Sequence, residues 1–333
     1  MLQGLRDADP GHLVGARRPV IVALLLVACS TGPEATPGAG PPGTAPVKLK
    51  VMLNWFPEPE FGGFYEALLT HKYEAAGLDV TLIPGGPGVP VLEMLASGQA
   101  DVAISGADDL LLKRAKGLDA VAVFPGFQDS PVGLMVHAES GVTTMAQVPG
   151  PTGATPRTVA IEAGSPFQQY LWSQMGWEGK VAMVPTTGSL GAFAADPNLI
   201  QQAYVSSEPC VAEGQGLKIG FLPAREVGWN PYSSLAVVRG KDKDEAWVRR
   251  FQAASKEGWT NYVRDPVATD VEITRLNPDM PADRMSCITQ RQAPYVIGTD
   301  GLGAMTGARW KETADALTKA GMPVTADGAW LRP

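Results

Sequence analysis

Hydrophobic and polar residues alternate in VKLKVML, residues 47–53, and this period of two predicts a half-buried β-strand. Apolar residues then recur alternately at helical and strand spacing as far as residue 124. The predicted strands cover residues 47–53, 78–83, 102–105 and 120–124, and the predicted helices cover residues 62–76, 90–97 and 108–116. This alternation predicts a mainly parallel sheet with right-handed crossovers, with ligands bound outside the carboxyl ends of its strands.

The same rhythm restarts after a predicted strand at residues 132–137. The later predicted elements cover residues 158–161, 166–175, 181–184, 190–195, 203–205, 218–222 and 234–239. We therefore expect an α/β protein with two lobes, lobe 1 from residues 47–131 plus 235–333 and lobe 2 from residues 132–234. Two crossings between lobes form a two-strand hinge, an arrangement that allows closure around a ligand.

The carboxyl-terminal part is predicted to be mostly helical. Two apolar stripes recur there at helical spacing, and such stripes on long amphipathic helices are typical of core packing. The stripes consist of Trp247, Val248, Phe251, Ala254, Trp259 and Tyr262, and of Trp310, Ala314 and Leu317.

The amino-terminal sequence carries a targeting signal. Arg17 and Arg18 precede a short apolar run, residues 20–28, and the tetrapeptide LVAC that ends it resembles a bacterial lipoprotein signal box. We expect a signal peptide over residues 1–29 with lipidation at Cys29; an ordinary cleaved signal is the alternative. Residues 30–46 are rich in Pro and Gly and predict an extended tether. The expected location is extracytoplasmic and membrane-anchored, and the choice of membrane stays open.

Charge and cysteine content narrow the function classes. A net charge of −7 is unlike a nucleic-acid-binding surface. Apart from Cys29, only Cys210 and Cys287 are present. Because they fall in different predicted lobes, we expect two small buried thiols, with a disulfide as the alternative.

NWFPEPEFGGFY, residues 54–65, places five aromatic rings between a predicted strand and a predicted helix. We expect Trp55 to stack on a planar ligand, with Phe61 or Tyr65 as the next contact. Phe56 and Phe64 are expected in the core. The amide of Asn54 suits the orientation of a ring edge, because it offers both a donor and an acceptor.

Carboxyl groups are present within this stretch and again after the third predicted strand. Glu58 and Glu60 are either buried against a cationic or amino-bearing ligand or solvated in a loop. Ser105, Asp108 and Asp109 follow the third predicted strand, and Ser105 and Asp109 are candidate ligand contacts. One of the two aspartates is expected to cap the next helix while the other faces the ligand.

Three positions in lobe 2 contribute further candidate ligand-binding residues. Gly164 and Ser165 begin a predicted helix, where free amides and a hydroxyl suit an anionic group. Ser207 and Glu208 follow another predicted strand. Tyr232 precedes the return crossing and either reaches the ligand or packs the hinge.

Four stretches together resemble the solute-binding proteins of ABC importers: LNWFPEPEFGGFYEA from Leu53, GQADVAIS from Gly98, RAKG from Arg114 and YVSSEP from Tyr204. The resemblance covers about residues 47–320, and it is strongest to thiamine-pyrimidine and riboflavin binders, which are related to sulfonate and nitrate binders. It implies a type II periplasmic-binding-protein fold. Glu208 resembles the acidic residue that binders of aminopyrimidines direct at ring nitrogens, with a hinge-side salt bridge as its alternative role.

The same fold includes a thiamine-pyrimidine synthase that uses pyridoxal phosphate, iron and its own histidine. In this sequence Ser105 stands where that enzyme has its lysine and Asp109 where it has its histidine, so catalysis is not expected. We therefore expect a monomeric, cofactor-free binding protein that passes a nitrogen heterocycle to a permease and its ATPase. A binder of sulfonate, nitrate or a similar anion is the alternative, and delivery to a sensor is a third possibility.

Overall fold

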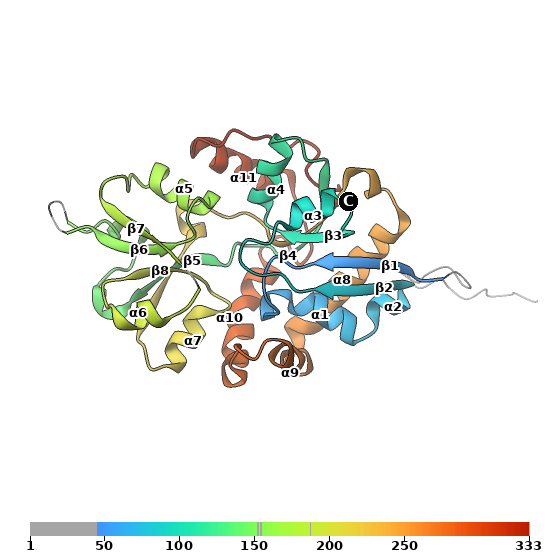
Figure 1. Ribbon diagram of the computed structural model, residues 1–333, viewed down its shortest axis with the longest axis horizontal. Helices are drawn as coiled ribbons and strands as arrows, with labels where there is room; N and C mark the ends of the chain where they lie inside the picture. The colour runs from blue at the N-terminus through green and yellow to red at the C-terminus, as the bar shows by residue number, and fades with distance from the viewer. Residues whose placement is uncertain (1–44, 152, 154, 187, 333) are drawn as a thin grey trace, which may run out of the picture. The chain divides into compact units, whose positions relative to one another are not determined.

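The computed structural model describes residues 45–151, 153, 155–186 and 188–332. Its described residues form two five-stranded sheets covered by helices (Figure 1). The first sheet has the order β2-β1-β3-β10-β4. Its strands are β1 (Val47–Met52), β2 (Leu78–Ile83), β3 (Val102–Ser105), β4 (Ala120–Phe127) and β10 (Ser233–Arg239).

The second sheet has the order β7-β6-β8-β5-β9. Its strands are β5 (Val132–His137), β6 (Arg157–Ile161), β7 (Val181–Pro185), β8 (Ile200–Tyr204) and β9 (Ile219–Pro223). The strands of each sheet come from the segments predicted for one lobe, apart from the first two residues of β10. The lobe boundaries themselves stay a prediction.

Both sheets are mainly parallel, as expected, but each is mixed, because four of its strands run in one direction and one strand runs in the other. In the first sheet β1 runs parallel to β2 and β3, whereas β10 runs antiparallel to β3 and β4. In the second sheet β6 runs parallel to β7 and β8, whereas β5 runs antiparallel to β8 and β9. The antiparallel strands are the two that the chain enters on crossing from one sheet to the other. The α/β class is confirmed.

Helices connect and cover the strands. They are α1 (Gly62–Leu69), α2 (Lys72–Ala75), α3 (Val91–Ala96), α4 (Ala107–Ala115), α5 (Pro166–Gln174), α6 (Gly191–Ala195), α7 (Glu208–Gly214), α8 (Ala246–Arg264), α9 (Val267–Leu276), α10 (Met285–Ile297) and α11 (Gly307–Lys319). The single helix predicted at residues 62–76 is divided, because His71 adopts a left-handed backbone with φ +57° between α1 and α2.

Both apolar stripes of the carboxyl-terminal part lie in the core, as predicted. Phe251 and Trp259 of α8 are fully buried, as are Trp310 and Leu317 of α11, and Trp247 is half-buried. The Gly-Gly pair at the start of α1 lets α8 approach closely. A Cβ at Gly63 would lie 2.1 Å from the ring of Trp259, so a larger residue does not fit without rearrangement.

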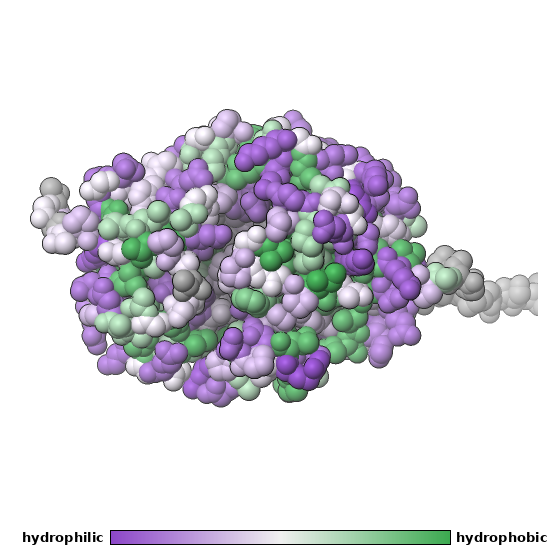
Figure 2. Space-filling model, viewed as in Figure 1, coloured by the Kyte–Doolittle hydropathy of each residue, from purple (hydrophilic) through white to green (hydrophobic). Residues whose placement is uncertain are grey.

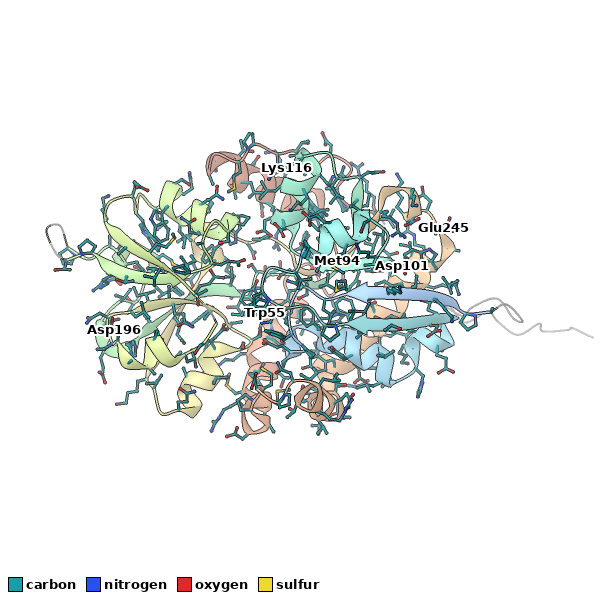
Figure 3. All side chains as sticks on the ribbon, in the orientation of Figure 1. Trp55, Met94, Asp101, Lys116, Asp196 and Glu245 are labelled. Carbon is teal, nitrogen blue, oxygen red and sulfur yellow. A yellow bond between two sulfur atoms is a disulfide. The ribbon has the colours of Figure 1, made fainter. Side chains whose placement is uncertain are left out.

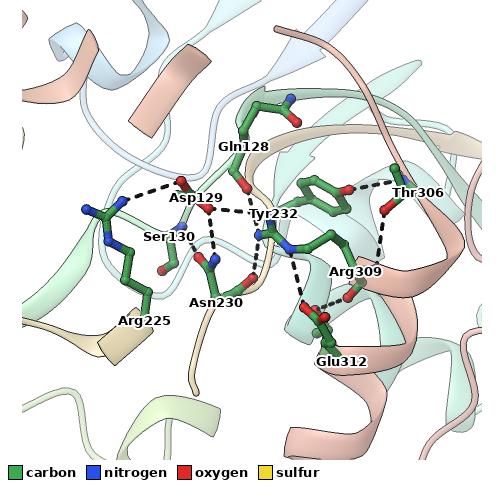
Figure 4. A network of polar contacts seen from close by, with 10 residues as sticks. Gln128, Asp129, Ser130, Arg225, Asn230, Tyr232, Thr306, Arg309 and Glu312 are labelled. Atoms are coloured by element: carbon green, nitrogen blue, oxygen red, sulfur yellow. Dashed lines mark hydrogen bonds and ion pairs between the residues drawn. The ribbon is translucent and has the colours of Figure 1, made fainter. Parts of the chain in front are cut away.

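The two chain crossings between the sheets are joined by a polar network (Figure 4). Asn230 on the return crossing donates to Asp129 at 2.8 Å and accepts from the Ser130 amide at 2.8 Å. Arg309 of α11 donates to the carbonyl oxygens of Gln128 and Asn230 and forms an ion pair with Asp129 at 3.3 Å. The crossings are therefore tied to each other and to α11.

Cys210 of α7 and Cys287 of α10 form a disulfide with a Cα–Cα distance of 5.9 Å, so the expectation of two free thiols is wrong. The sequence placed the cysteines in different lobes, but the two helices that carry them pack together. The predicted signal peptide, Cys29 and almost all of the tether lie outside the described residues. Within the part of the chain that is described, no helix is both long and apolar enough to cross a bilayer.

Candidate functional site

The loop after β1 carries the aromatic and acidic residues singled out in the sequence, and backbone contacts hold it on several sides. The Gly85 amide donates to the carbonyl of Trp55 at 2.9 Å. Asn277 and Gln292, near the end of α9 and on α10, donate to the carbonyls of Pro57 and Pro59 at 3.0 Å each. The loop is therefore fixed by side chains more than 200 residues away in sequence.

Trp55 faces the segment that follows β7. A Cβ placed at Gly188 would lie 4.0 Å from Cζ2 of the indole, so the ring comes close to the second sheet's side of the protein. Figure 3 shows Trp55 between the strands of the two sheets, and Figure 2 shows the surface hollowed next to this region. The half-buried indole stays a candidate stacking surface.

The other rings of the loop differ from the prediction in part. Phe64 is fully buried, as expected. Phe56 is 45% exposed, so its predicted core position is wrong. Its ring packs edge-on against the outer side of the Trp55 indole, with 5.5 Å between the two ring centroids. Phe61 and Tyr65, predicted as further ligand contacts, are 0% and 4% exposed within the core of the first sheet's side. Their packing favours a structural role.

Three glutamates, Glu58, Glu60 and Glu208, form a carboxyl cluster between the loop and the start of α7. Burial, and after it the charges of Glu60 and Glu208, raise the pKa of Glu58 well above its usual value. Burial, and then the charge of Glu208, raise the pKa of Glu60 to about 8. Burial raises the pKa of Glu208 to about 7. Glu60 is only 8% exposed, so the alternative of a solvated loop carboxylate is wrong for it.

Three more carboxyl groups, Asp108, Asp109 and Glu162, lie at the start of α4 and after β6. Burial, and then the charge of Asp109, raise the pKa of Asp108 to about 7. Partial desolvation of the carboxyl groups also raises the pKa values of Asp109 and Glu162, although both residues are exposed at the protein surface. Tyr204 interacts with both sets: burial, followed by the charges of Glu60, Asp108, Glu162 and Glu208, raises the pKa of its phenol.

These six carboxyl groups form no direct ion pair with a cation among the described residues, although the charges of Lys113 and Lys116 lower the pKa of Asp109 in part. None of the ion pairs found among the described residues includes any of them, so the salt bridge considered for Glu208 is not formed there. Glu208 instead accepts a hydrogen bond from the Tyr204 amide at 2.9 Å. No set of three His, Cys, Asp or Glu side chains in the described ranges is arranged to hold a metal ion.

Two polar atoms near this region are buried without a protein partner among the described residues. They are Oδ1 of Asn54, beside Trp55, and Oγ of Ser206, which precedes Ser207 and Glu208. A buried polar atom without a partner costs about 1–3 kcal/mol, and a bound ligand can remove that cost. Ser105, at the end of β3, is 3% exposed.

The cap of α4 differs from the prediction. Its N-cap is Gly106, and no side chain caps it, so neither Asp108 nor Asp109 is the N-cap residue. The two aspartates lie in the first helical turn, where negative charge is favourable. Asp109 is exposed at the protein surface.

The predicted anion position at the start of α5 is already occupied by local hydrogen bonds. Ser165 is the N-cap and accepts from the Gln168 amide at 3.2 Å. The Gly164 amide donates to the Gln168 side chain at 3.3 Å, and the Ser165 amide donates to the Glu162 carbonyl at 3.2 Å. These groups serve the helix, and a carboxylate lies beside them.

Tyr232 packs beside the return crossing, in the region predicted as the hinge. It is fully buried, and its hydroxyl accepts from the Thr306 amide at 3.0 Å (Figure 4). The guanidinium of Arg309 lies 5.0 Å from the centre of its ring.

A cavity of about 470 Å³ opens between α4 and α5. Asp109, Lys113, Gly164, Gln169 and Met322 contribute to its lining. The cavity therefore lies next to the second set of carboxyl groups, and it brings Asp109 and Gly164 to one opening.

Sequence reasoning missed Glu162 and Tyr204 as members of the acidic region and Gln292 as a support of the loop. Glu162 and Tyr204 lie at the carboxyl ends of strands, which is the edge where ligands are expected. Their position along the chain could therefore have indicated that they belong to the site. Gln292 gave no signal, because its contact with Pro59 depends on the tertiary packing of α10.

Comparison with known proteins places the chain in a family. A sequence model described as NMT1/THI5 like matches residues 58–269. The riboflavin-binding protein RibY of Chloroflexus aurantiacus is 25% identical over 91% of both chains. A formylaminopyrimidine-binding protein of Halalkalibacterium halodurans is 24% identical over 74% of both chains.

Solved structures with the same architecture include two sulfonate-binding proteins. The SsuA protein of Escherichia coli superposes with a TM-score of 0.66 at 16% identity, over 87% of this chain and 93% of its own. The SsuA protein of Xanthomonas axonopodis bound to MOPS gives 0.65 at 14% identity, over 87% and 100%. The chain has the periplasmic-binding-protein fold and belongs to the NMT1/THI5-like family.

Proposed function

We propose that the protein is an extracytoplasmic solute-binding protein of an ABC importer, and that its ligand is a small planar nitrogen heterocycle with N–H donors. The ligand stacks on Trp55 and directs its donors at Glu58, Glu60 and Glu208. A pyrimidine precursor of thiamine and a flavin both belong to this chemical class.

The carboxyl cluster is the observation that supports this ligand class most strongly. Three carboxyl groups are brought together with raised pKa values and without a cation. Burying such groups costs several kcal/mol unless hydrogen-bond donors or positive charge accompany them. An aminopyrimidine supplies an amino donor and ring nitrogens in one plane, and a ring nitrogen accepts from a protonated carboxyl group or, when it is itself protonated, donates to a carboxylate. Charge-assisted hydrogen bonds of this kind are about twice as strong as neutral ones.

Buried acceptors extend the same argument. Asn54 offers an unpartnered Oδ1 beside the indole, and an acceptor of this type matches a donor on the ring edge. A flat indole face adds roughly 0.5–1.5 kcal/mol of stacking beyond the burial of area.

A sulfonate or nitrate ligand fits this site poorly, because carboxyl groups repel an anion to the extent that they are ionised and the carboxyl cluster has no cation to attract it. The amides at Gly164 and Ser165, where we expected an anion, already donate within their own turn. The likeness to sulfonate-binding structures concerns the fold, and it does not favour the anion as a ligand.

Binding by closure follows from the distribution of the site residues. Trp55, Glu58 and Glu60 come from the loop after β1, whereas Ser207 and Glu208 follow β8 of the second sheet. A ligand that contacts both sets stabilises the closed arrangement by its difference in affinity for the closed and open forms. The two crossing strands provide the hinge.

The remaining parts of the proposal concern location and partners. The lipoprotein signal at Cys29 would anchor a monomer to a membrane, where a permease and its ATPase receive the ligand. Two relatives are named as binding proteins, for riboflavin and for formylaminopyrimidine, which supports binding rather than catalysis.

A ligand screen tests this proposal. The melting temperature of the protein is measured with aminopyrimidines, riboflavin, alkanesulfonates and nitrate. A ligand at about 100 times its Kd stabilises the folded state by roughly 2.7 kcal/mol, which gives a clear shift. A shift with heterocycles alone supports the proposal, whereas a shift with anions alone overturns it.

A further inference from the structure

The disulfide joins helices that belong to different sheets. α7, which carries Cys210, follows β8 of the second sheet. α10, which carries Cys287, packs on β4 of the first sheet and on the short 3-10 turn at Pro59–Phe61. The bond is therefore a covalent link across the two halves of the fold, and it lies on one side of the carboxyl cluster.

Both helices reach the carboxyl cluster directly. Glu208 is the first residue of α7, two positions before Cys210. Gln292 lies five positions after Cys287 on α10, is 2% exposed, and donates to the carbonyl of Pro59 at 3.0 Å. Pro59 separates Glu58 from Glu60. A continuous series of connections thus runs from Glu208 through α7, the disulfide, α10 and the Gln292 hydrogen bond to the turn that carries Glu58 and Glu60.

Charged groups on these helices support the contact but do not neutralise the cluster. Arg291 of α10 pairs with Glu213 of α7 at 2.7 Å, and Arg284, next to Gly214, pairs with Asp283 at 2.8 Å. Around Glu208 itself the facing titratable groups are Glu58, Glu60 and Tyr204. Repulsion among these carboxyl groups, to the extent that they are ionised, opposes their contact, and the ion pair between Arg291 and Glu213 is partly exposed and offsets little of it.

Among the residues that the structure describes, no disulfide joins the two halves on the opposite side of the site. The cavity of about 470 Å³ lies between α4 and α5, and these helices belong to a different apolar cluster from Cys210 and α10. In Figure 1 α7 and α10 lie below the sheets, and α4, α5 and α11 lie above them. A hydrogen bond from Gln174 of α5 to the Lys319 carbonyl at 2.6 Å connects the two halves there.

We propose that the Cys210–Cys287 disulfide is a positioning device: it holds Glu208 against Glu58 and Glu60 before ligand arrives, and it confines opening to the side of α4 and α5. The consequence for ligand affinity rests on the function proposed above. The positioning of Glu208 in the free protein does not.

Removal of the bond tests the proposal. The double variant Cys210→Ser/Cys287→Ser is compared with the oxidised protein and with protein treated with a reductant. Glu208 is followed by NMR titration of ¹³C-labelled carboxyl groups without ligand, and its signal is assigned with Glu208→Gln. We expect the Glu208 pKa to fall toward the ordinary value of glutamate, because the carboxyl moves away from its buried surroundings.

Affinity gives the second measurement, with riboflavin and 4-amino-2-methylpyrimidine as probes. If the competent arrangement falls to about one tenth of the population, Kd rises about tenfold. Arg291→Gln, which removes the ion pair but keeps the disulfide, is the matched control and should change neither Kd nor the Glu208 titration. Gln292→Leu removes the hydrogen bond from α10 to the Pro59 carbonyl and leaves the disulfide intact. This variant should show the same loss of ligand affinity and the same fall in the Glu208 pKa, so the test stands even if the cysteine variant fails to fold.

The outcomes separate the two proposals. A lower melting temperature of the cysteine variant with an unchanged Glu208 titration would mean that the disulfide only stabilises the fold, and it would overturn the positioning role. A changed titration without binding of either probe to the oxidised protein would support the positioning role and reject the proposed ligand class.

Discussion

Glu60 and Glu208 follow strands of different sheets, yet their carboxyl groups interact: burial and the charge of Glu208 together raise the pKa of Glu60 to about 8. This repulsion is present in the protein without ligand. A site built in this way is destabilised until donors arrive, so ligand binding and closure are coupled through the same pair of residues.

Replacement of Glu60 tests the cost of that repulsion. A carboxyl whose pKa is raised by folding contributes most stability below about pH 4.5, and this contribution is lost as the pH rises through the folded value near 8. The free protein should therefore lose stability between these limits. Glu60→Gln should raise the free energy of unfolding at high pH by at least about 1 kcal/mol, as measured by denaturant unfolding. Glu139→Gln, at an exposed carboxyl, is the control, and equal pH profiles for the three proteins would contradict the account.

Trp55→Ala tests the stacking surface. Loss of the indole should weaken binding of a heterocycle by roughly 1 kcal/mol or more, about fivefold in Kd, as measured by calorimetry. Trp247→Ala removes another half-buried indole, on α8, and should leave Kd unchanged. An unaltered affinity in the Trp55 variant would remove this ring from the site.

Gly63→Ala tests the close packing of α1 on α8. An added Cβ would lie 2.1 Å from the ring of Trp259, so one helix must shift. Overpacking of this kind costs about 1–3 kcal/mol of unfolding free energy. Gly191→Ala, at the start of α6, meets no atom closer than 3.6 Å and should be neutral or slightly stabilising. The reverse order of stability would contradict the packing described here.

Arg309 connects the two chain crossings between the sheets to α11, and its removal should loosen the predicted hinge. Arg309 and Asp129 are 12% and 13% exposed, and loss of one partner leaves the other charge largely buried. Arg309→Gln should therefore destabilise the protein by about 3 kcal/mol in denaturant unfolding. Arg225→Gln removes the more exposed partner of Asp129 and should cost distinctly less. A similar loss for both variants would argue against a special role of Arg309.

Periodicity predicted the elements well, because most of them bury one regular face. The ranges predicted for β2, β3 and β5 agree with the structure residue for residue, and both apolar stripes of α8 and α11 lie in the core. The reversed direction of two strands was not predictable in this way. β5 and β10 look like their neighbours in sequence, and only the exchange of strands between sheets makes them antiparallel.

The site was predictable where position along a strand indicates it. Trp55, Ser207 and Glu208 follow strands, and the structure brings their region together with Glu58. Phe56 is exposed although it was expected in the core, and Phe61 is buried although it was expected at the ligand. The direction of the loop decides which rings face inward, and that direction depends on contacts from the end of α9 and from α10. The disulfide was missed for the same reason, since helix packing brings Cys210 and Cys287 together.

The most direct test of the central claim is calorimetric binding of an aminopyrimidine, riboflavin, ethanesulfonate and nitrate at about pH 6 and about pH 8, corrected for titration of each ligand. We predict that a heterocycle binds and that its affinity rises up to about tenfold toward the higher pH, as Glu208 and Glu60 ionise. Binding of ethanesulfonate or nitrate alone, weakening as the carboxyl groups ionise, would contradict the proposed ligand class.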